Sequence, residues 1–318
     1  VATNVDQTSL TIPDIDVVVD KGEAKISIAK DGIQGLFLKD ISLADIAQRK
    51  GRAGRTKAGK YFLCSDKPMK YRDKYSTPGI QTSILDRVVL QLAVAGLDAE
   101  KLQFFHQPDI QAILTAKKEL SVIGALSGNQ VTELGYKIVK FPVAVQLARM
   151  IVESEKYGVT DQVLTIAAIL EIGGLLTSEG HYKKFTKENS SDLLAELDVW
   201  EFINNLQCID FKKLGIKKRN FFKIKDHIKK LNEVLYGIVE IKHNDDREAI
   251  LKSCLCGLVS NIYIKDFDKY INENGTEAKL DNNSCLHSSS QIIIGIPHKV
   301  ECIARYGWKK TINFVKFA

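Results

Sequence analysis

The chain of 318 residues lacks an apolar run long enough to cross a lipid bilayer. Its longest apolar stretch, residues 163–176, contains Glu171 and falls short of the roughly 20 residues that a membrane-spanning helix needs. No signal peptide is recognisable in these residues. The sequence therefore predicts that the apolar stretch is a buried helix and that a membrane is not a partner.

Cysteine is scarce, and its six copies are scattered. Only Cys254 and Cys256 lie close together, and a Cys-x-Cys pair without a second pair or a partnering histidine is a weak zinc signal. Glu179 and His181 also lie close together but lack a third ligand at useful spacing. We therefore expect no metal site, and buried thiols in a reducing compartment: the cytoplasm, or the nucleus in a eukaryote.

The composition is that of an ordinary globular chain, with 45% hydrophobic and 26% charged residues, enough for two to four small domains. The net charge is +6, and lysines and arginines gather in short clusters, among them residues 212–213, 217–219 and 229–230. Such clusters supply affinity for phosphate backbones, so a polyanion is an expected partner. A lysine-rich solvated surface remains the alternative.

Residues 48–55 read Gln-Arg-Lys-Gly-Arg-Ala-Gly-Arg and are the most informative pattern in the chain. Arginine presents a planar fork of donors to phosphate oxygens, and glycines allow the backbone to approach a ligand closely. The pattern suits recognition of a phosphate chain. A basic surface loop and a nucleic-acid patch are the alternatives.

A second motif precedes it: residues 1–12 read VATNVDQTSLTI, followed by a strand-like run over residues 15–20. In this order the two motifs resemble motifs V and VI of superfamily-2 helicases of the DEAH/RHA group, whose usual forms are near TN-x-A-E-T-S-L-T-I and QR-x-GR-x-GR. Asp6 and Gln7 depart from that pattern, standing where alanine and glutamate are commoner. Bacterial HrpA-type members of this group are similar over residues 48–52, and eukaryotic members of the group are the alternative.

The resemblance implies a nucleotide-facing set of side chains. Gln48, Arg52 and Arg55 would face the γ-phosphate of ATP, with the two arginines as arginine fingers that neutralise charge on the transferring phosphoryl group. Ser9 and Thr11 would couple the nucleotide state to the loop that touches RNA.

The resemblance also implies an RNA side and a missing partner domain. Thr3 and Asn4 would bond backbone phosphates of single-stranded RNA. ATP and Mg²⁺ would be bound mainly by a first RecA-like domain that carries a P-loop lysine and the DEAH carboxylates, yet the sequence contains no G-x-x-x-x-G-K-[ST] and no Asp-Glu-x-His. Because it also opens inside motif V, we expect a C-terminal fragment that is inactive as an ATPase by itself.

Strand and helix patterns predict the first two blocks of the chain, residues 1–75 and 76–143. Alternating residues 25–29 and 33–38 around Asp31-Gly32 predict a hairpin, which either guides RNA or only completes a sheet. A last strand is expected over residues 59–64, then a polar linker over 65–78. Helical spacing from Ile80 and again after Pro108, a turn at 127–129 and a helix capped by Thr132 follow. Residues 126–142 resemble the winged-helix segment of the helicases.

Apolar stripes predict helices through the third block, and the run Ser190-Ser191-Asp192 is expected to supply the N-cap and acidic first turn of one of them. The fourth begins with a helix over 249–258 and continues with strands at 262–264, 291–294 and 300–303. Residues 305–309 are the best local candidate for a nucleic-acid surface, with a hairpin that buries Trp308 as the alternative, and residues 288–290 resemble the serine-containing loop of the helicases. The expected fold is multidomain. The blocks are the α/β end of a second RecA-like domain (1–75), a winged helix (76–143), a helical bundle or ratchet domain (144–247) and an OB-fold-like β-barrel (248–318).

These expectations combine into one function: the C-terminal portion of an ATP-dependent RNA helicase that moves 3′→5′ on single-stranded RNA, with room for a protein activator at its C-terminal domain. The alternative is a non-catalytic module for RNA binding or partner docking that derives from a helicase. A DNA-directed winged-helix protein would leave both motifs unexplained.

Overall fold

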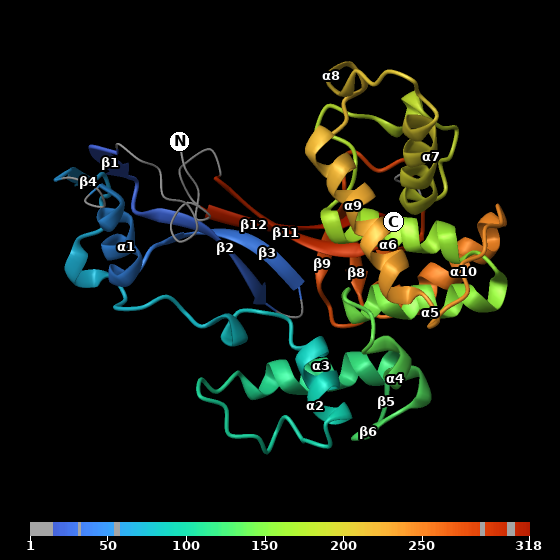
Figure 1. Cartoon of the computed structure of the whole chain (residues 1–318), viewed down its shortest axis with the longest axis horizontal. Helices are drawn as coiled ribbons and strands as arrows, with labels where there is room; N and C mark the ends of the chain where they lie inside the picture. The colour runs from blue at the N-terminus through green and yellow to red at the C-terminus, as the bar shows by residue number, and fades with distance from the viewer. Residues whose placement is uncertain (1–14, 31–32, 54–57, 287–289, 304–308) are drawn as a thin grey trace. The chain divides into compact units, whose positions relative to one another are not determined.

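The computed structural model describes residues 15–30, 33–53, 58–286, 290–303 and 309–318, which form two compact units (Figure 1). The first unit comprises residues 1–83, 105–108 and 299–311, and the second comprises 84–104, 109–298 and 312–318. In the described part of the chain, no helix is long and apolar enough to cross a membrane.

The first unit is built around short strands and one helix. Its strands are β1 (Val17–Asp20), β2 (Glu23–Lys30), β3 (Ile33–Asp40) and β4 (Lys60–Leu63), its α-helix is α1 (Leu43–Ala53), and its 3₁₀ turns are η2 (Met69–Tyr71) and η3 (Gly79–Gln81). β1 pairs in parallel with β4, and α1 lies beside both (Figure 1). Ala24, Ile41 and Ile46 form the small core between the hairpin and the helix.

The hairpin predicted around Asp31-Gly32 is confirmed by the pairing of the described residues on either side. β2 and β3 pair antiparallel along their full length, from Glu23 with Asp40 to Lys30 with Ile33. Beyond β3, the end of β11 (Ile296–Ile303) pairs in parallel through Lys299 with Gly35. Gly35 is required there, because a Cβ atom would lie 2.9 Å from the Cβ of Lys299.

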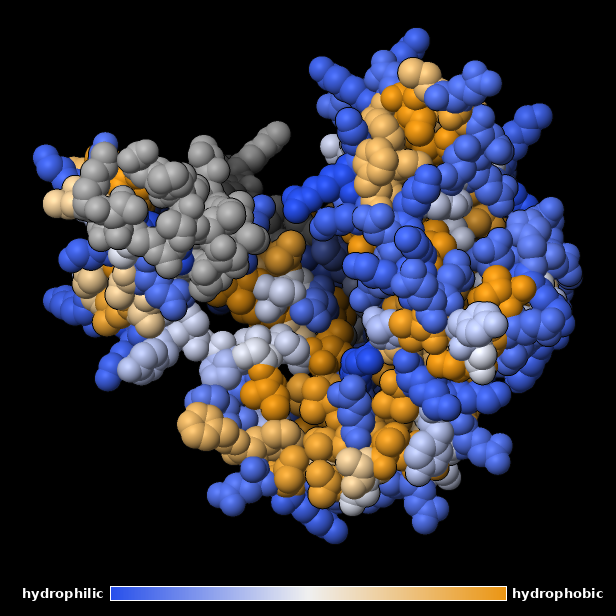
Figure 2. Space-filling view, viewed as in Figure 1, coloured by the Kyte–Doolittle hydropathy of each residue, from blue (hydrophilic) through white to orange (hydrophobic). Residues whose placement is uncertain are grey.

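The second unit opens with a small helical group: α2 (Asp86–Val94), α3 (Ile110–Val122), the hairpin of β5 (Leu126–Ser127) with β6 (Gln130–Val131), and α4 (Glu133–Ile138). Thr132 caps α4 as predicted, since its Oγ1 accepts a hydrogen bond of 3.0 Å from the Gly135 amide. The helix expected from Ile80 begins only at Asp86, because Ile80 lies in η3. Figure 2 shows apolar side chains gathered over α2 and α3, where Ile84, Leu97 and Leu114 are exposed.

The core of this unit is a helical bundle whose helices are α5 (Val145–Tyr157), α6 (Thr160–Ile172), α7 (Asp192–Asn204), α8 (Phe211–Leu214), α9 (Lys218–Leu235) and α10 (Arg247–Leu258). The buried helix predicted in 163–176 is α6, which is apolar on almost every side because neighbouring helices surround it. Helix α10 packs tightly on α5: a Cβ atom on Gly257 would lie 2.2 Å from the Gln146 carbonyl oxygen. The expected cap at Ser191 is present on α7.

Strands complete the second unit: β7 (Ile262–Asp266), β8 (Lys269–Asn272), β9 (Glu277–Leu280), β10 (Ile292–Ile294) and the end of β12 (Lys309–Lys316). They are ordered β10-β7-β8-β9-β12, with β12 parallel to β9. Tyr263, Tyr270, Ile293 and Val315 form their shared core. The sequence predicted β7, β10 and the end of β11, and it missed β8, β9 and β12.

Two buried carboxylates lie one turn apart on α7. Glu196 accepts hydrogen bonds from the Leu175 amide at 3.1 Å and from the Tyr182 hydroxyl at 3.0 Å. Asp192 accepts one from the Cys285 amide at 2.7 Å, so the start of α7 holds the loop that follows β9. Burial outweighs these bonds and raises the pKa of Glu196 to about 7.

This raised pKa predicts a pH-dependent stability. The folded protein binds the Glu196 proton more tightly than the unfolded chain, so the free energy of unfolding should fall as pH rises from the ordinary value of 4.5 to about 7. Glu196→Gln, which keeps an acceptor for both bonds, should remove much of that fall. Urea unfolding at pH 5 and pH 8 measures it, with the exposed Glu233→Gln as control. Equal pH dependence in both variants would contradict the assignment.

Candidate functional site

Helix α1 carries the described part of the arginine-rich motif. It begins with a capping box, in which the Ser42 hydroxyl accepts a hydrogen bond from the Asp45 amide and the Asp45 carboxylate accepts one from the Ser42 amide, both at 3.2 Å. The motif residues up to Ala53 are helical, so Gly51 lies inside a helix rather than in a tight loop. Outside the backbone of α1 itself, a Cβ atom on Gly51 would meet none of the described atoms within 4 Å.

Gln48 and Arg52 are brought together on this helix. Four residues apart, they lie on one side of α1, where Gln48 is exposed and Arg52 is half-buried. A side-chain amide and a guanidinium side by side form a donor-rich surface that suits phosphate oxygens. The other predicted site residues, Thr3, Asn4, Ser9, Thr11 and Arg55, lie outside the described residues.

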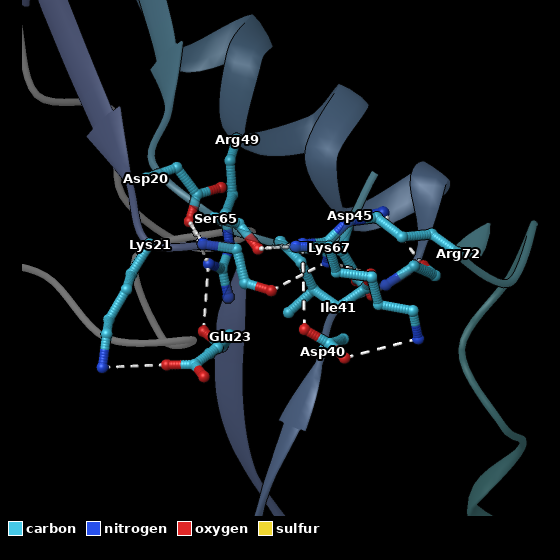
Figure 3. A network of polar contacts seen from close by, with 12 residues as sticks. Asp20, Lys21, Glu23, Asp40, Ile41, Asp45, Arg49, Ser65, Lys67 and Arg72 are labelled. Atoms are coloured by element: carbon cyan, nitrogen blue, oxygen red, sulfur yellow. Dashed lines mark hydrogen bonds and ion pairs between the residues drawn. The ribbon is translucent and has the colours of Figure 1, made fainter. Parts of the chain in front are cut away.

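Arg49 points to a different partner. Its Nη1 atom lies 2.7 Å from Oδ1 of Asp20 and 3.3 Å from the Glu23 carbonyl oxygen (Figure 3). The side chain of Asp20 is only 3% exposed and that of Arg49 only 17%. This arginine of the motif therefore binds the protein itself, and sequence reasoning did not single it out.

The Asp20 carboxylate is the centre of a polar network between β1 and β2. It accepts hydrogen bonds from the Gly22 amide at 2.9 Å and from the Tyr61 hydroxyl at 2.7 Å, besides that from Arg49. Burial opposes its ionisation, but these three donors outweigh burial and hold the pKa of Asp20 below its ordinary value. Asp20 is thus a fixed anion beneath α1.

Arg72 approaches the same turn from the segment after β4. Its guanidinium is fully buried and donates to the carbonyl oxygens of Gly22 at 2.9 Å and Ile41 at 3.0 Å and to the Ser65 hydroxyl at 2.6 Å (Figure 3). Gly22 has a φ of 73°, and a Cβ atom on it would lie 2.8 Å from the Arg72 Nη2 atom. A glycine in the left-handed region is required for this contact.

The segment predicted as a polar linker, residues 65–78, is therefore folded against the helix. The amides of Leu43 and Ala44, at the start of α1, donate to the carbonyl oxygens of Asp73 at 2.9 Å and Lys74 at 3.1 Å. The Ser76 hydroxyl also contacts the Asp45 carboxylate. These contacts satisfy the free amides of the first turn of α1 and fix where the helix begins.

The remaining candidates from the sequence are a metal site, the cysteines, and residues 288–290 and 305–309. Among the described residues, no group of three or more histidine, cysteine, aspartate or glutamate side chains is arranged to hold a metal ion. The expectation of buried thiols is wrong for Cys64 and Cys208, which are exposed, and correct for Cys254. Residues 305–308 and 288–289 lie outside the described part of the chain, and the described Ser290 accepts a hydrogen bond from Tyr270 through its carbonyl oxygen.

Comparison with known proteins identifies the relatives of the chain. Residues 144–227 match the family described as helicase associated domain (HA2), ratchet-like. The chain is 31% identical over 297 residues to the ATP-dependent RNA helicase HrpA of Escherichia coli (strain K12), an alignment that covers 84% of this chain and 23% of that protein. It is homologous to DEAH-box RNA helicases.

Two further relatives agree. The ATP-dependent RNA helicase HrpA homolog of Haemophilus influenzae is 28% identical over 317 residues, with 90% of this chain and 24% of that protein covered. The probable ATP-dependent RNA helicase DHX35 of Homo sapiens is 33% identical over 215 residues, with 63% of this chain and 30% of that protein covered. The chain thus spans less than a third of the length of these three helicases, and the HA2 match covers α5 to the middle of α9.

Removal of the Arg72 guanidinium should destabilise the polar network at the start of α1. Arg72→Ala removes the donor to the buried Ile41 carbonyl oxygen, while the Gly22 carbonyl oxygen keeps the Ile41 amide at 3.1 Å. An unsatisfied buried group costs roughly 1–3 kcal/mol. Thermal unfolding and hydrogen exchange of the first turn of α1 should both show the loss. Lys67→Ala, which removes the half-exposed neighbour of Asp40, is the control and should cost about 1 kcal/mol or less. Equal effects would mean that Arg72 is not an anchor.

Proposed function

We propose that this chain is the C-terminal part of an ATP-dependent RNA helicase and that α1 completes a nucleotide site whose other half lies on another RecA-like domain. The observation that carries the proposal is the pairing of Gln48 with Arg52 on the surface of α1. Gln48 and Arg52 lie together on one side, while the intervening Arg49 is bound to Asp20. The sequence similarity to HrpA and DHX35 supports the same reading.

The donor set on α1 fits a phosphate chain. Arg52, with Arg55 after it, would neutralise the charge that develops on the transferring phosphoryl group, and Gln48 would hold the γ-phosphate or the attacking water. Ser9 and Thr11 would report the nucleotide state to the RNA side. Mg²⁺ prefers carboxylate and water oxygens, so it would be held with ATP by the other domain rather than by these amide and guanidinium groups.

RNA contacts would come from several parts of the chain. Thr3 and Asn4 would bond backbone phosphates, and the β2–β3 hairpin would guide the strand. The proposed domains of the chain are the end of a RecA-like domain over 1–75, a winged helix over 76–143, a ratchet bundle over 144–247 and an OB-fold-like domain over 248–318. Translocation would run 3′→5′, in the cytoplasm or, in a eukaryote, the nucleus.

The charges of the bundle support a polyanion partner. Helices α8 and α9 carry many exposed basic side chains. They are Lys212, Lys213, Lys218, Arg219, Lys223, Lys225, Lys229 and Lys230. Exposed cations gain affinity from a phosphate backbone, because binding releases the counterions condensed on it.

Loss of the Arg52 guanidinium tests the nucleotide role. In the full-length protein, Arg52→Ala should lower RNA-stimulated ATP hydrolysis by about 10³-fold or more, while single-stranded RNA binding stays within about twofold. Steady-state ATPase assays and fluorescence anisotropy measure the two quantities. Lys50→Gln, an equal loss of charge on the same helix, is the control. Full ATP turnover in Arg52→Ala would overturn the proposal.

A non-catalytic RNA-binding or docking module derived from a helicase is the second candidate. The exposed apolar side chains over α2 and α3 favour it, since such surfaces are typical of partner contacts (Figure 2). The sequence upstream decides between the two: an intact P-loop lysine and DEAH carboxylates favour the enzyme, and their loss favours the module. The site for a protein activator on the C-terminal domain is common to both.

The RNA contact can be measured on this chain directly. Anisotropy of a labelled single-stranded RNA should show binding that weakens with salt, by roughly 0.7 in the log–log slope for each phosphate contact. Lys229→Gln/Lys230→Gln should reduce that slope by about 1.4. Lys118→Gln, whose lysine is paired with Glu273 at 3.1 Å, should leave it unchanged. If neither RNA nor single-stranded DNA shows salt-dependent binding, the nucleic acid is bound by another part of the protein.

A further inference from the structure

The side of α1 that faces the protein is held by two kinds of contact. Ile46 and Ala53 are buried on it, four or fewer residues from Arg49 in either direction. Apolar burial is non-directional, so these two residues hold the helix against the sheet without fixing its rotation about its own axis. The Arg49 guanidinium, with one nitrogen between the Asp20 carboxylate and the Glu23 carbonyl oxygen, adds that directional constraint.

The Asp20 carboxylate, which binds Arg49, is itself held in place by other hydrogen bonds. Asp20 lies at the end of β1, where the Gly22 amide and the Tyr61 hydroxyl hold its two oxygens, one each. Tyr61 comes from β4, so both strands of the parallel pair fix this carboxylate. Burial and the negative charge of Asp20 raise the pKa of the Tyr61 hydroxyl, which therefore stays a donor. The ion pair has little freedom on the Asp20 side.

The same guanidinium joins α1 to the hairpin. Glu23, whose carbonyl oxygen accepts the second bond, is the first residue of β2. A rotation of α1 that moved Gln48 or Arg52 would have to break the Asp20 bond, the Glu23 bond or both. The hairpin and the donor-rich side of α1 are therefore held to one buried contact.

We propose that Arg49 is a positioning residue: through its ion pair with Asp20 it fixes the rotation of α1 and thereby the placement of Gln48 and Arg52 on the nucleotide. This inference rests on the proposed function and assigns the intervening arginine a role that differs from that of its neighbours. A displacement of about 1 Å at a catalytic group can cost on the order of 10²-fold in rate, so the effect should fall on turnover rather than on ATP binding.

The test uses the full-length protein and four variants: Arg49→Gln, Arg49→Lys, Asp20→Asn and the double Asp20→Asn/Arg49→Gln. Arg49→Gln and Asp20→Asn should each lower kcat about tenfold or more and leave KM for ATP within about twofold. The double variant should be no slower than the worse single, because both changes remove one contact. Arg49→Lys keeps the charge and should recover part of the turnover.

Controls separate positioning from folding and from the proposed function. Lys50→Gln, an exposed neighbour, should match the wild type, and thermal unfolding defines a temperature at which every variant is folded. If Arg52→Ala is inactive while Arg49→Gln behaves like Lys50→Gln, the inference is wrong and the proposed function stands. The inference also falls if the two single effects multiply in the double variant. If the wild type hydrolyses no ATP, the proposed function fails and the inference falls with it.

Discussion

One buried anion organises the first unit. The Asp20 carboxylate is nearly inaccessible to water, and a charge in that position is tolerable only because three donors surround it. Those donors come from the turn after β1, from β4 and from α1, three elements that the chain brings together from 41 residues of sequence. Without the carboxylate, the Arg49 charge would itself be buried and unpaired, so strand pair and helix depend on the same atom group.

Two described arginines of this unit bind buried groups of the protein. Arg49 and Arg72 both direct their guanidinium groups inward, to a carboxylate and to backbone carbonyl oxygens. Arg52 lies within one helical turn of both Gln48 and Arg49 and is half-buried. Arg49 and Arg72 thereby hold the turn at Gly22 and the helix that carries Arg52.

The core of the second unit is held mainly by closely packed helices. Helix α6 is buried almost all round, and α10 approaches α5 so closely that only glycine fits at position 257. Polar contacts then join the bundle to the strands: Asp192 at the start of α7 holds the Cys285 amide from the loop after β9. The HA2 match falls on the helices from α5 to the middle of α9.

How far the sequence predicted this structure depends on the range of the interaction. Caps at Thr132 and Ser191 and the β2–β3 hairpin rest on residues close in sequence, and each was predicted. The strands β8, β9 and β12 were missed because their pairing partners, not their own residues, decide that they are strands. The inward Arg49 is the sharpest case: within a motif of three arginines, residue type gives each the same chemistry, and only the position of a carboxylate 29 residues away shows which one binds the protein. Helical spacing places Arg52 within one turn of both Gln48 and Arg49, and it cannot say which side faces the sheet until Ile46 and Ala53 are seen to be buried. The division of roles in the motif is therefore a tertiary property, carried by Asp20 as much as by the arginines themselves.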